Sequence, residues 1–268
     1  MGAPAPTHYD HVIWVVMENK SSGSVLGTRS SSGTTALASR CGVATGYRAV
    51  AHPSLPNYLA LTSGSTHGVT DDAGPDQHRV AGPSLFSEVA SAGRDWATYA
   101  ESMPFPCARY PTSSYATKHN PALYYTALYP ACPSHDLPLG TTRSGPLARA
   151  LAAGTLPAFS LVVPDLCNDT HDCPVAQGDA WLRQWLDVIT SSRTYAAGRT
   201  AVFLTWDEDD SAHGNRVALI AVAPCIRPGT TTPAAFTHLS LLRTTEELLG
   251  LAGTLVPTAS SMRAAFGM

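Results

Sequence analysis

Four acidic residues occupy positions 207–210, directly after the apolar run AVFLTW. Such a run predicts a buried strand, and side chains alternate between the two faces of a strand, so only some of these carboxylates can point to water. An isolated acidic run is most often a solvated loop. The other apolar runs of the chain decide between that interpretation and a site that binds a cation.

Two more apolar runs end in the same way. The strands predicted over 11–17, 158–163 and 200–206 lead into Glu18–Asn19, Asp165 and Asp207–Glu208, respectively. In a parallel sheet the carboxyl ends of the strands meet at one edge, and ligands bind there. Carboxylates crowded at this edge repel one another unless shared protons or a cation relieve them. Oxygen ligands favour a hard divalent ion such as Mg²⁺, Ca²⁺ or Mn²⁺.

Ser54 is the candidate nucleophile. It lies between two prolines, before the apolar run NYLALTS, which predicts a helix from Asn57 that Gly64 closes. The start of a helix favours an anion such as phosphate, although Ser54 or Asn57 could equally act as a helix cap. A serine hydroxyl is a weak nucleophile until a metal or a base activates it. Since no G-x-S-x-G motif surrounds Ser54, a Ser-His-Asp hydrolase is disfavoured.

Three of the ten histidines have polar surroundings suited to chemistry. They are His119 in KHNP, His171 between Asp169 and Asp172, and His238 just before the last predicted helix. Each could donate to phosphate oxygens, protonate a leaving group or bind a second metal. The NDT sequence at 168–170 also matches a glycosylation acceptor, but its polar neighbours favour a site.

The order of the elements predicts an α/β fold. Strands over 11–17, 158–163, 200–206 and 216–223 are interleaved with helical patterns over 84–93, 146–154, 179–192 and 240–251. Strands without polar alternation predict a mostly parallel sheet that helices cover on both faces. Ser240 is expected to cap the last helix, where Arg243 and Glu247 are spaced for an ion pair. The Ser/Gly-rich stretch 21–35 predicts a surface loop.

Composition narrows the class of protein. The net charge of −3 and the absence of a basic stripe disfavour nucleic-acid binding, and no apolar window is long enough for a transmembrane segment. Six cysteines without a C-x-x-C pair favour disulfides over metal-binding thiolates. The trial pairs are 107–132 and 167–173, which leaves Cys41 and Cys225 to pair or stay free. A secreted or extracytoplasmic location is expected, with the signal peptide, which this sequence does not contain, already removed.

Seven motifs, in order, resemble the bacterial phosphoesterase family of the alkaline-phosphatase-like superfamily, which holds secreted acid phosphatases and non-haemolytic phospholipases C. They are HVIWVVMENKS, HPSLPNYLALTSG, KHNP, VVPDLCNDTHDC, AQGDAWL, TWDEDD and THLSLLRTTEELLGL. The ordered set is more specific than any single motif. The resemblance implies a three-layer α/β/α sandwich with a mostly parallel central sheet, and a single catalytic domain over 1–268.

The resemblance also implies roles for individual residues. The expected ligands of one divalent metal ion are Glu18, Asn19, Ser54, Asp207 and Glu208. The expected catalytic residues are Ser54, His119 and His171, and the expected phosphate contacts are Asn19, Asn57 and His238. Asp209 and Asp210 are expected to support the site or to face solvent. A second ion on Asp165 or Asp169 with His171 and His238 stays open, although Glu208, where two-metal members carry histidine, favours one ion.

The implied function is that of a metal-dependent phosphomonoesterase, acting through a phosphoserine, with phosphoinositides among its substrates. Monoesters are favoured because the chain is too short for the additional domains of the family's phospholipases C. Two alternatives stay open: a phospholipase C-type phosphodiesterase, and a non-catalytic relative that binds phosphate or a lipid headgroup. The presence of Ser54 beside the acids disfavours the second, because a binding protein needs no nucleophile. A sulfatase is disfavoured because SLPNY lacks the arginine of the sulfatase signature.

Overall fold

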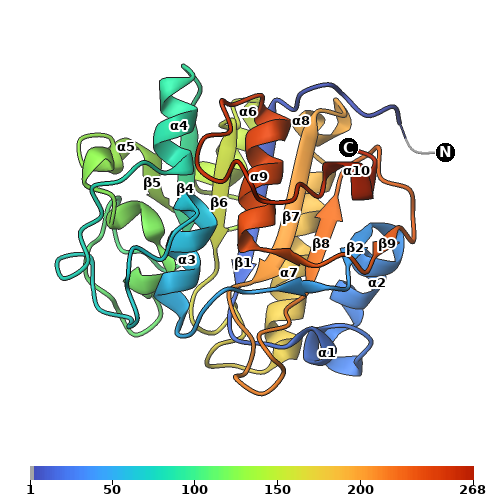
Figure 1. The fold of residues 1–268 in the computed structure, drawn as a ribbon, viewed down its shortest axis with the longest axis horizontal. Coiled ribbons are helices and arrows are strands. Elements are labelled where there is room, and N and C mark those ends of the chain that lie inside the picture. The colour runs from blue at the N-terminus through green and yellow to red at the C-terminus, as the bar shows by residue number, and fades with distance from the viewer. Residues whose placement is uncertain (1–2) are drawn as a thin grey trace.

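An eight-stranded sheet runs through the centre of the computed structural model, which describes residues 3–268 (Figure 1). The strand order is β5-β4-β6-β1-β7-β8-β2-β9. The strands are β1 His11–Met17, β2 Gly42–Ala44, β4 Trp96–Ala100, β5 Asp136–Pro138, β6 Phe159–Val163, β7 Thr200–Trp206, β8 Leu219–Val222 and β9 Thr231–Thr232. A small second sheet pairs β3 (Tyr47–Arg48) with β10 (Phe236–Thr237).

The central sheet is mostly parallel, as the sequence predicts. All neighbouring strands from β5 to β7 run parallel, whereas β8 pairs antiparallel with both β7 and β2. The strands β6 and β7 are completely buried, and β1 is buried beyond His11. This explains why their sequences show no polar alternation, since both faces of the sheet contact helices.

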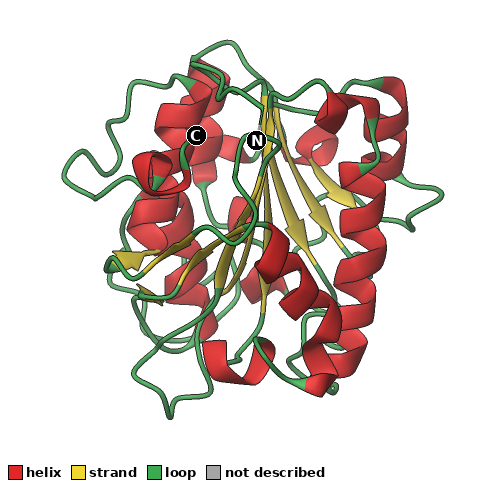
Figure 2. Ribbon diagram, turned by 90° about the vertical axis from the view of Figure 1, so that its right-hand side faces the viewer, coloured by secondary structure: helices red, strands yellow, loops and turns green. Residues whose placement is uncertain are grey.

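Helices cover both faces of the sheet. Figure 2 shows the sheet between the two layers of helices. The helices are α1 Ser22–Val25, α2 Ser32–Arg40, α3 Ser54–Ser63, α4 Leu85–Ser91, α5 Cys132–His135, α6 Pro146–Ala153, α7 Val175–Thr190, α8 Arg193–Ala196, α9 His238–Leu249 and α10 Arg263–Phe266. On one face α3 packs against α9, and on the other α2 packs against α7 (Figure 1). The expected three-layer α/β/α arrangement is therefore confirmed. In the described range 3–268, no helix combines the length and apolar character that crossing a bilayer requires.

Two local predictions are wrong. The stretch 21–35 contains α1 and the start of α2 instead of a loop, because the carboxylate of Asp179 on α7 accepts the N–H groups of Gly33 and Thr34 and so stabilises the start of α2. The last helix begins at His238, and its N-cap is Thr237 with Ser240 at the third helical position. The Arg243–Glu247 pair is confirmed, with 3.0 Å between Nε and Oε1.

Both trial disulfides are present. Cys107 bonds to Cys132, and Cys167 bonds to Cys173, while Cys41 and Cys225 are free thiols. The first bond encloses a segment of irregular chain that includes the 3₁₀ turn η2, Thr117–His119. The second closes the short loop that follows β6.

Candidate active site and metal centre

The ends of β6, β1 and β7 lie side by side, and the acids that follow these strands meet in one cluster. The N–H of Glu18, after β1, donates to the carbonyl of Asp169 at 2.8 Å, and the N–H of Asp207, after β7, donates to the carbonyl of Met17 at 2.9 Å. The three acids are completely buried, and Glu208 beside them is 5% exposed. The predicted gathering of acids at one edge of the sheet is therefore present in the structure.

Glu18 lies at the centre of this cluster. Its Oε2 accepts a hydrogen bond from the Ser54 hydroxyl at 3.0 Å, and its Oε1 accepts one from the Tyr58 hydroxyl. The Nε2 atom of His119 lies 3.2 Å from Glu18 Oε2, and its Nδ1 atom lies 3.4 Å from Asp169 Oδ2. The start of α3 and the turn η2, which are distant in the sequence, thus contact the same buried carboxylate.

Ser54 is the first residue of α3 and follows Pro53, which is the N-cap. Proline is tolerated around the first turn because the N–H groups there have no partner within the helix. The Ser54 side chain does not cap the helix and points to Glu18 instead. The helix therefore starts three residues before the predicted Asn57, and Gly64 ends it with a φ of 80°.

Asn57 does not face the open part of the site. Its Oδ1 accepts the N–H groups of Val50 and Ala51, and its Nδ2 donates to the carbonyls of Ala51 and Pro53. Both ends of the amide are thus used by the segment that leads into Ser54. In this arrangement Asn57 holds the nucleophile's loop and has no free donor for phosphate.

Asn19 bridges two of the acids. Its backbone N–H donates to Asp207 Oδ1 at 3.2 Å, and its φ of 51° turns the chain so that the side chain also reaches the cluster. The end of the amide lies 2.9 Å from Glu18 Oε2 and 3.1 Å from Asp207 Oδ1. With the nitrogen in this position the amide donates to both carboxylates. With the oxygen there, three oxygen ligands would surround a cation.

The donor set fits a cation. Asp207 Oδ2 is buried and makes no hydrogen bond or ion pair to any residue in the described range. The buried atoms His119 Nε2, Asp169 Oδ2 and Glu208 Oε2 make no hydrogen bond there and have only ion-pair contacts, with Glu18, His119 and His52, respectively. Buried polar atoms normally have hydrogen-bond partners, so this set of atoms fits a bound cation. Glu18, His119 and Asp169 offer ligand atoms that all lie within 4.8 Å of one another. The carboxylate oxygens suit Mg²⁺ or Mn²⁺, and an imidazole nitrogen among the ligands favours a transition metal such as Mn²⁺ over Mg²⁺.

Burial raises the pKa values of the acids in the cluster and lowers that of His119. It raises the pKa of Asp169 to about 8, and burial with the charge of Glu208 raises the pKa of Asp207 to about 7. Burial and the charges of Asp207 and Asp169 raise the pKa of Glu18 well above its ordinary range. Burial also lowers the pKa of His119 well below 6.5, so its ring is neutral at pH 7. A bound cation would favour the ionised form of the acids.

The other two predicted histidines have different surroundings. His171 lies at the edge of the site with 29% of its side chain exposed, and its Nδ1 pairs with Asp172 Oδ1 at 2.6 Å. Its ring centre lies 6.1 Å from that of His119. His238 is buried, with Nδ1 bonded to the Tyr47 hydroxyl and Nε2 to the carbonyl of Asp207. His238 therefore supports the backbone of an acid and offers no free nitrogen to a phosphate.

Of the two acids left open for a second ion, Asp169 belongs to the cluster and Asp165 does not. The Asp165 carboxylate accepts the N–H groups of Cys167 and Asn168 and the Ser102 hydroxyl, so it organises the loop after β6. In the run 207–210, Asp209 accepts three backbone N–H groups of residues 211–215 and holds that loop. Asp210 pairs with His213 in solvent.

Several residues of the site were not identified from the sequence. Tyr58 follows Ser54 by one helical turn, so spacing on α3 could have indicated it. His52 Nδ1 lies 2.6 Å from Glu208 Oε2, and Lys118 Nζ donates to Asp72 Oδ2 at 2.9 Å. Although burial lowers the pKa of Lys118, its hydrogen bond to Asp72 and the surrounding acids raise it overall, so the side chain is charged.

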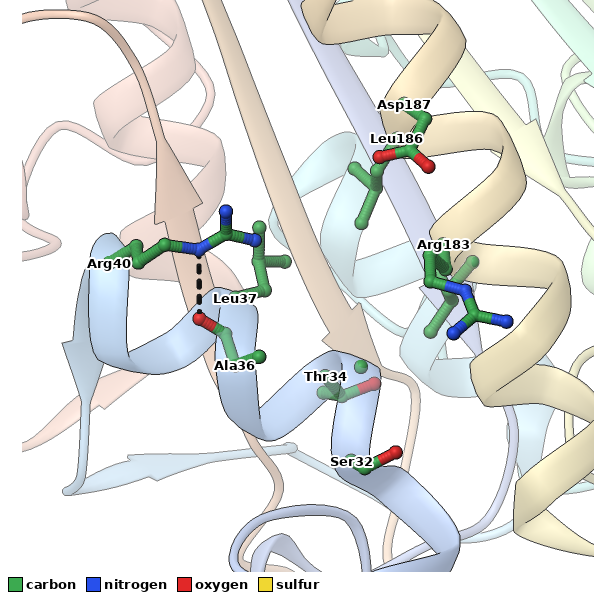
Figure 3. Close-up of a pocket in the computed structure, with 10 residues that line it drawn as sticks. Ser32, Thr34, Ala36, Leu37, Arg40, Arg183, Leu186 and Asp187 are labelled. Carbon is green, nitrogen blue, oxygen red and sulfur yellow. Dashed lines mark hydrogen bonds between the residues drawn. The ribbon is translucent and has the colours of Figure 1, made fainter.

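A separate groove lies between α2 and α7 (Figure 3). Its volume is about 250 Å³. Leu37, Leu182 and Leu186 give it an apolar part, while Arg40 and Arg183 are among its polar lining residues. None of the acids at the strand ends lines this groove, so it is distinct from the candidate active site.

Comparison with known proteins identifies the family of the chain. The family model described as the phosphoesterase family matches residues 33–252. The phosphatidylinositol-3-phosphatase of Mycobacterium tuberculosis is 33% identical over 259 residues, which cover 95% of this chain and 81% of that protein. An acid phosphatase of Aspergillus fumigatus is 28% identical over 80% of this chain, which spans 50% of the length of the fungal protein.

Solved structures show the same fold at low sequence identity. A protein in the alkaline phosphatase superfamily from Vibrio parahaemolyticus superposes with a TM-score of 0.68 and 12% identity, over 96% of this chain and 71% of that one. The lipoteichoic acid synthase LtaP of Listeria monocytogenes superposes with a TM-score of 0.65 and 11% identity, over 91% and 72% of the two chains. With its alkaline-phosphatase-like fold and phosphatase relatives, the chain belongs to the phosphoesterase family and is a hydrolase of phosphoric esters.

Proposed function

We propose that the protein is a metal-dependent phosphomonoesterase that forms a phosphoserine at Ser54. The observation that carries this proposal is the 3.0 Å hydrogen bond from the Ser54 hydroxyl to Glu18 Oε2 inside the acid cluster. Burial raises the pKa values of Asp207 and Glu208 to about 7, and the Ser54 hydroxyl lowers both by a smaller amount. A serine that served only as a helix cap would bond to backbone N–H groups instead.

The residues proposed to hold one divalent ion are Glu18, Asn19, Ser54, Asp207 and Glu208. His119 and Asp169 contact this set from the side of Glu18 and would complete it or hold a second ion. When bound, a divalent ion would lower the pKa of the serine hydroxyl and offset negative charge on the phosphoryl oxygens. The unpartnered Oδ2 atom of Asp207 supports this assignment.

The chain's own residues supply the remaining steps. Ser54 Oγ attacks phosphorus and forms the new P–O bond while the bond to the leaving alkoxide breaks. Glu18 Oε2, which already accepts the hydroxyl hydrogen, takes the proton from Ser54. His171 is proposed to protonate the leaving alkoxide, because it is partly exposed and pairs with Asp172, whereas buried His119 is neutral. Water then cleaves the phosphoserine and releases inorganic phosphate.

The substrate class is a phosphate monoester. The name of the Mycobacterium tuberculosis relative supports a phosphorylated inositol lipid as the first physiological substrate to test. A phospholipase C-type diesterase is the alternative, and it would release diacylglycerol without inorganic phosphate. We also propose an extracytoplasmic location, because both disulfides need an oxidising compartment to persist.

The deciding experiment measures release of inorganic phosphate from p-nitrophenyl phosphate by the wild type and Ser54→Ala, with and without a chelator. Ser63→Ala is the matched control, because it removes a buried hydroxyl from the other end of α3 that bonds to Leu59 and His67 and not to the acids. Activity is expected to fall at least about 10³-fold in Ser54→Ala and in chelator. It should persist in Ser63→Ala.

Trapping gives a second, independent measurement. Acid quenching during turnover of ³²P-labelled substrate should leave label on the wild-type chain, and peptide mapping should assign it to Ser54. Activity that survives Ser54→Ala would disprove the phosphoserine step. Absence of phosphate release across pH and metal ions, with diacylglycerol formed from phospholipid, would support the diesterase instead.

A further inference from the structure

One carboxylate joins the start of the nucleophile's helix to a lysine. Asp72 Oδ1 accepts the N–H of Leu55, the residue after Ser54, at 2.9 Å, and Asp72 Oδ2 accepts Lys118 Nζ at 2.9 Å. Lys118 is therefore held beside the first turn of α3 through a single side chain. The chain has two lysines, Lys20 and Lys118.

The position of Lys118 gives it access to both the cluster and solvent. It directly precedes His119 in the turn η2, and His119 contacts Glu18 and Asp169. The side chain of Lys118 is 22% exposed and that of Asp72 is 29% exposed, so the pair lies at the boundary between the buried acids and water. The Lys118 side chain is held through Asp72 beside the first turn of α3, which carries Ser54. Its ammonium group is thus within electrostatic reach of the acids around Ser54.

A phosphate group at Ser54 would need such a charge. The acids of the cluster repel phosphate. Both nitrogens of His119 lie against the carboxylates of Glu18 and Asp169, and both nitrogens of His238 are bonded within the protein. The N–H of Leu55, which an anion at the helix start would normally use, is already bonded to Asp72. Lys118 has three ammonium hydrogens and one bond to Asp72 among the contacts described, so it retains donors for a second acceptor.

We propose that Lys118 is a substrate-binding residue that donates to a non-bridging oxygen of the phosphoryl group, and that Asp72 is a positioning residue that holds it beside Ser54. This inference rests on the proposed function, since it takes Ser54 as the nucleophile. It predicts that loss of the Lys118 charge changes the affinity for phosphate and the affinity for the divalent cation in opposite directions. Lys118 attracts the phosphate dianion but repels the divalent cation.

The test measures binding of inorganic phosphate and of Mn²⁺ separately, by titration calorimetry, in the purified full chain. Lys118→Met removes the charge and keeps most of the side-chain length. Its Kd for inorganic phosphate, at saturating Mn²⁺, is expected to rise about 10- to 100-fold. Its Kd for Mn²⁺ without phosphate is expected to fall about three- to tenfold, because a nearby positive charge is gone. Lys118→Arg should recover at least part of the phosphate affinity.

Two further variants separate positioning from structure. Arg199→Met is the matched control, because it removes a cation from an ion pair with Asp10 at the opposite edge of the sheet and should leave both affinities unchanged. Asp72→Asn is expected to change phosphate affinity in the wild type but not in Lys118→Met, since it acts through Lys118. An effect of Asp72→Asn that persists unchanged in Lys118→Met would overturn the positioning role.

The outcomes distinguish this inference from the proposed function. If the wild type binds phosphate through Lys118 but hydrolyses no monoester, the proposed function fails and the lysine site stands. If the wild type is active and Lys118→Met keeps its phosphate affinity, the lysine site is disproved alone. If Lys118→Met loses affinity for both ligands and its melting temperature falls, Lys118 is a structural residue and the inference is overturned.

Discussion

The hydroxyl groups of Ser54 and Tyr58, one helical turn apart on α3, donate to the two different oxygens of the Glu18 carboxylate. One helix face therefore fixes the rotation of the carboxyl group at the centre of the acid cluster. Because neither oxygen can turn away without losing a hydrogen bond, Glu18 presents the same face to a bound ion and to the Ser54 hydroxyl.

Tyr58→Phe tests this arrangement. The substitution removes the bond to Glu18 Oε1 and leaves the packing of the ring, so kcat is expected to fall about tenfold, as loss of a hydrogen bond of about 1.5 kcal/mol to a charged group would require. Tyr124→Phe is the control, because its hydroxyl bonds to the carbonyl of Ala73 outside the cluster. Equal kcat values in wild type and Tyr58→Phe would show that Ser54 alone orients Glu18.

Substitutions of His119 and of His171 should affect different properties, namely metal binding and catalysis. His119→Ala is expected to weaken Mn²⁺ binding at least about tenfold, because His119 Nε2 lies 3.2 Å from Glu18 Oε2. His171→Ala should keep Mn²⁺ affinity within about threefold and lower kcat by about 10²-fold for an alkyl phosphate. The loss should be smaller for p-nitrophenyl phosphate, whose leaving group needs less protonation. A uniform loss on both substrates would contradict the role of His171 as acid.

The acid cluster predicts a pH dependence of stability. Burial raises the folded-state pKa of Asp169 to about 8 and that of Asp207, with the charge of Glu208, to about 7, above the ordinary aspartate value of 3.8. A raised acid pKa contributes stability that is present below the unfolded pKa and is lost as pH rises through the folded one. The melting temperature in chelator should therefore fall between pH 7 and pH 9, and Mn²⁺ should reduce that fall.

The pH range of this measurement matters because the buried histidines change stability with pH in the opposite direction. Burial lowers the pKa values of His119 and His238, so their contribution to stability is lost on acidification below about pH 6.5. Between pH 7 and pH 9 the acids dominate. Asp207→Asn should flatten the dependence in this window, measured by circular dichroism in chelator. A melting temperature that rises from pH 7 to pH 9 would contradict the buried, metal-free cluster.

The Cys107–Cys132 bond should stabilise the fold more than the Cys167–Cys173 bond. The sequence separations are 25 and 6 residues, which correspond to about 3.5 and about 2 kcal/mol of loop-closure entropy. Replacing both cysteines of one pair by serine, in separate variants, allows the free energies of unfolding in urea to be compared. A larger loss for the 167–173 variant would indicate that loop length does not determine the effect.

The sequence predicts that acids meet at one edge of the sheet, but it does not predict which acids belong to the buried cluster. Glu18 and Asp207 follow long apolar strands, and the rule for parallel sheets brings such positions to one edge. Asp165 and Asp169 lie on the same loop, and only its folded path decides that Asp165 binds backbone N–H groups while Asp169 turns to His119.

Other residues carry no local signal at all. Asp72 and Lys118 are 46 residues apart, and their pairing depends on how two irregular segments pack beside α3. The start of α2 has no local signal for the same reason, since its stabilising carboxylate comes from Asp179, distant in the chain. Asn57 and His238 look like ligands by type, and the folded chain satisfies both with protein partners.

The neighbouring positions of β6, β1 and β7 in the sheet have a mechanical consequence. A cation held by the residues after these strands would link the ends of the three strands in the middle of the sheet. The strand ends could then not separate without releasing the cation. Occupancy of the site would then slow amide hydrogen exchange along strands whose far ends lie well away from the ion. The rate of amide hydrogen exchange in the core strands would thus show whether the site holds a cation.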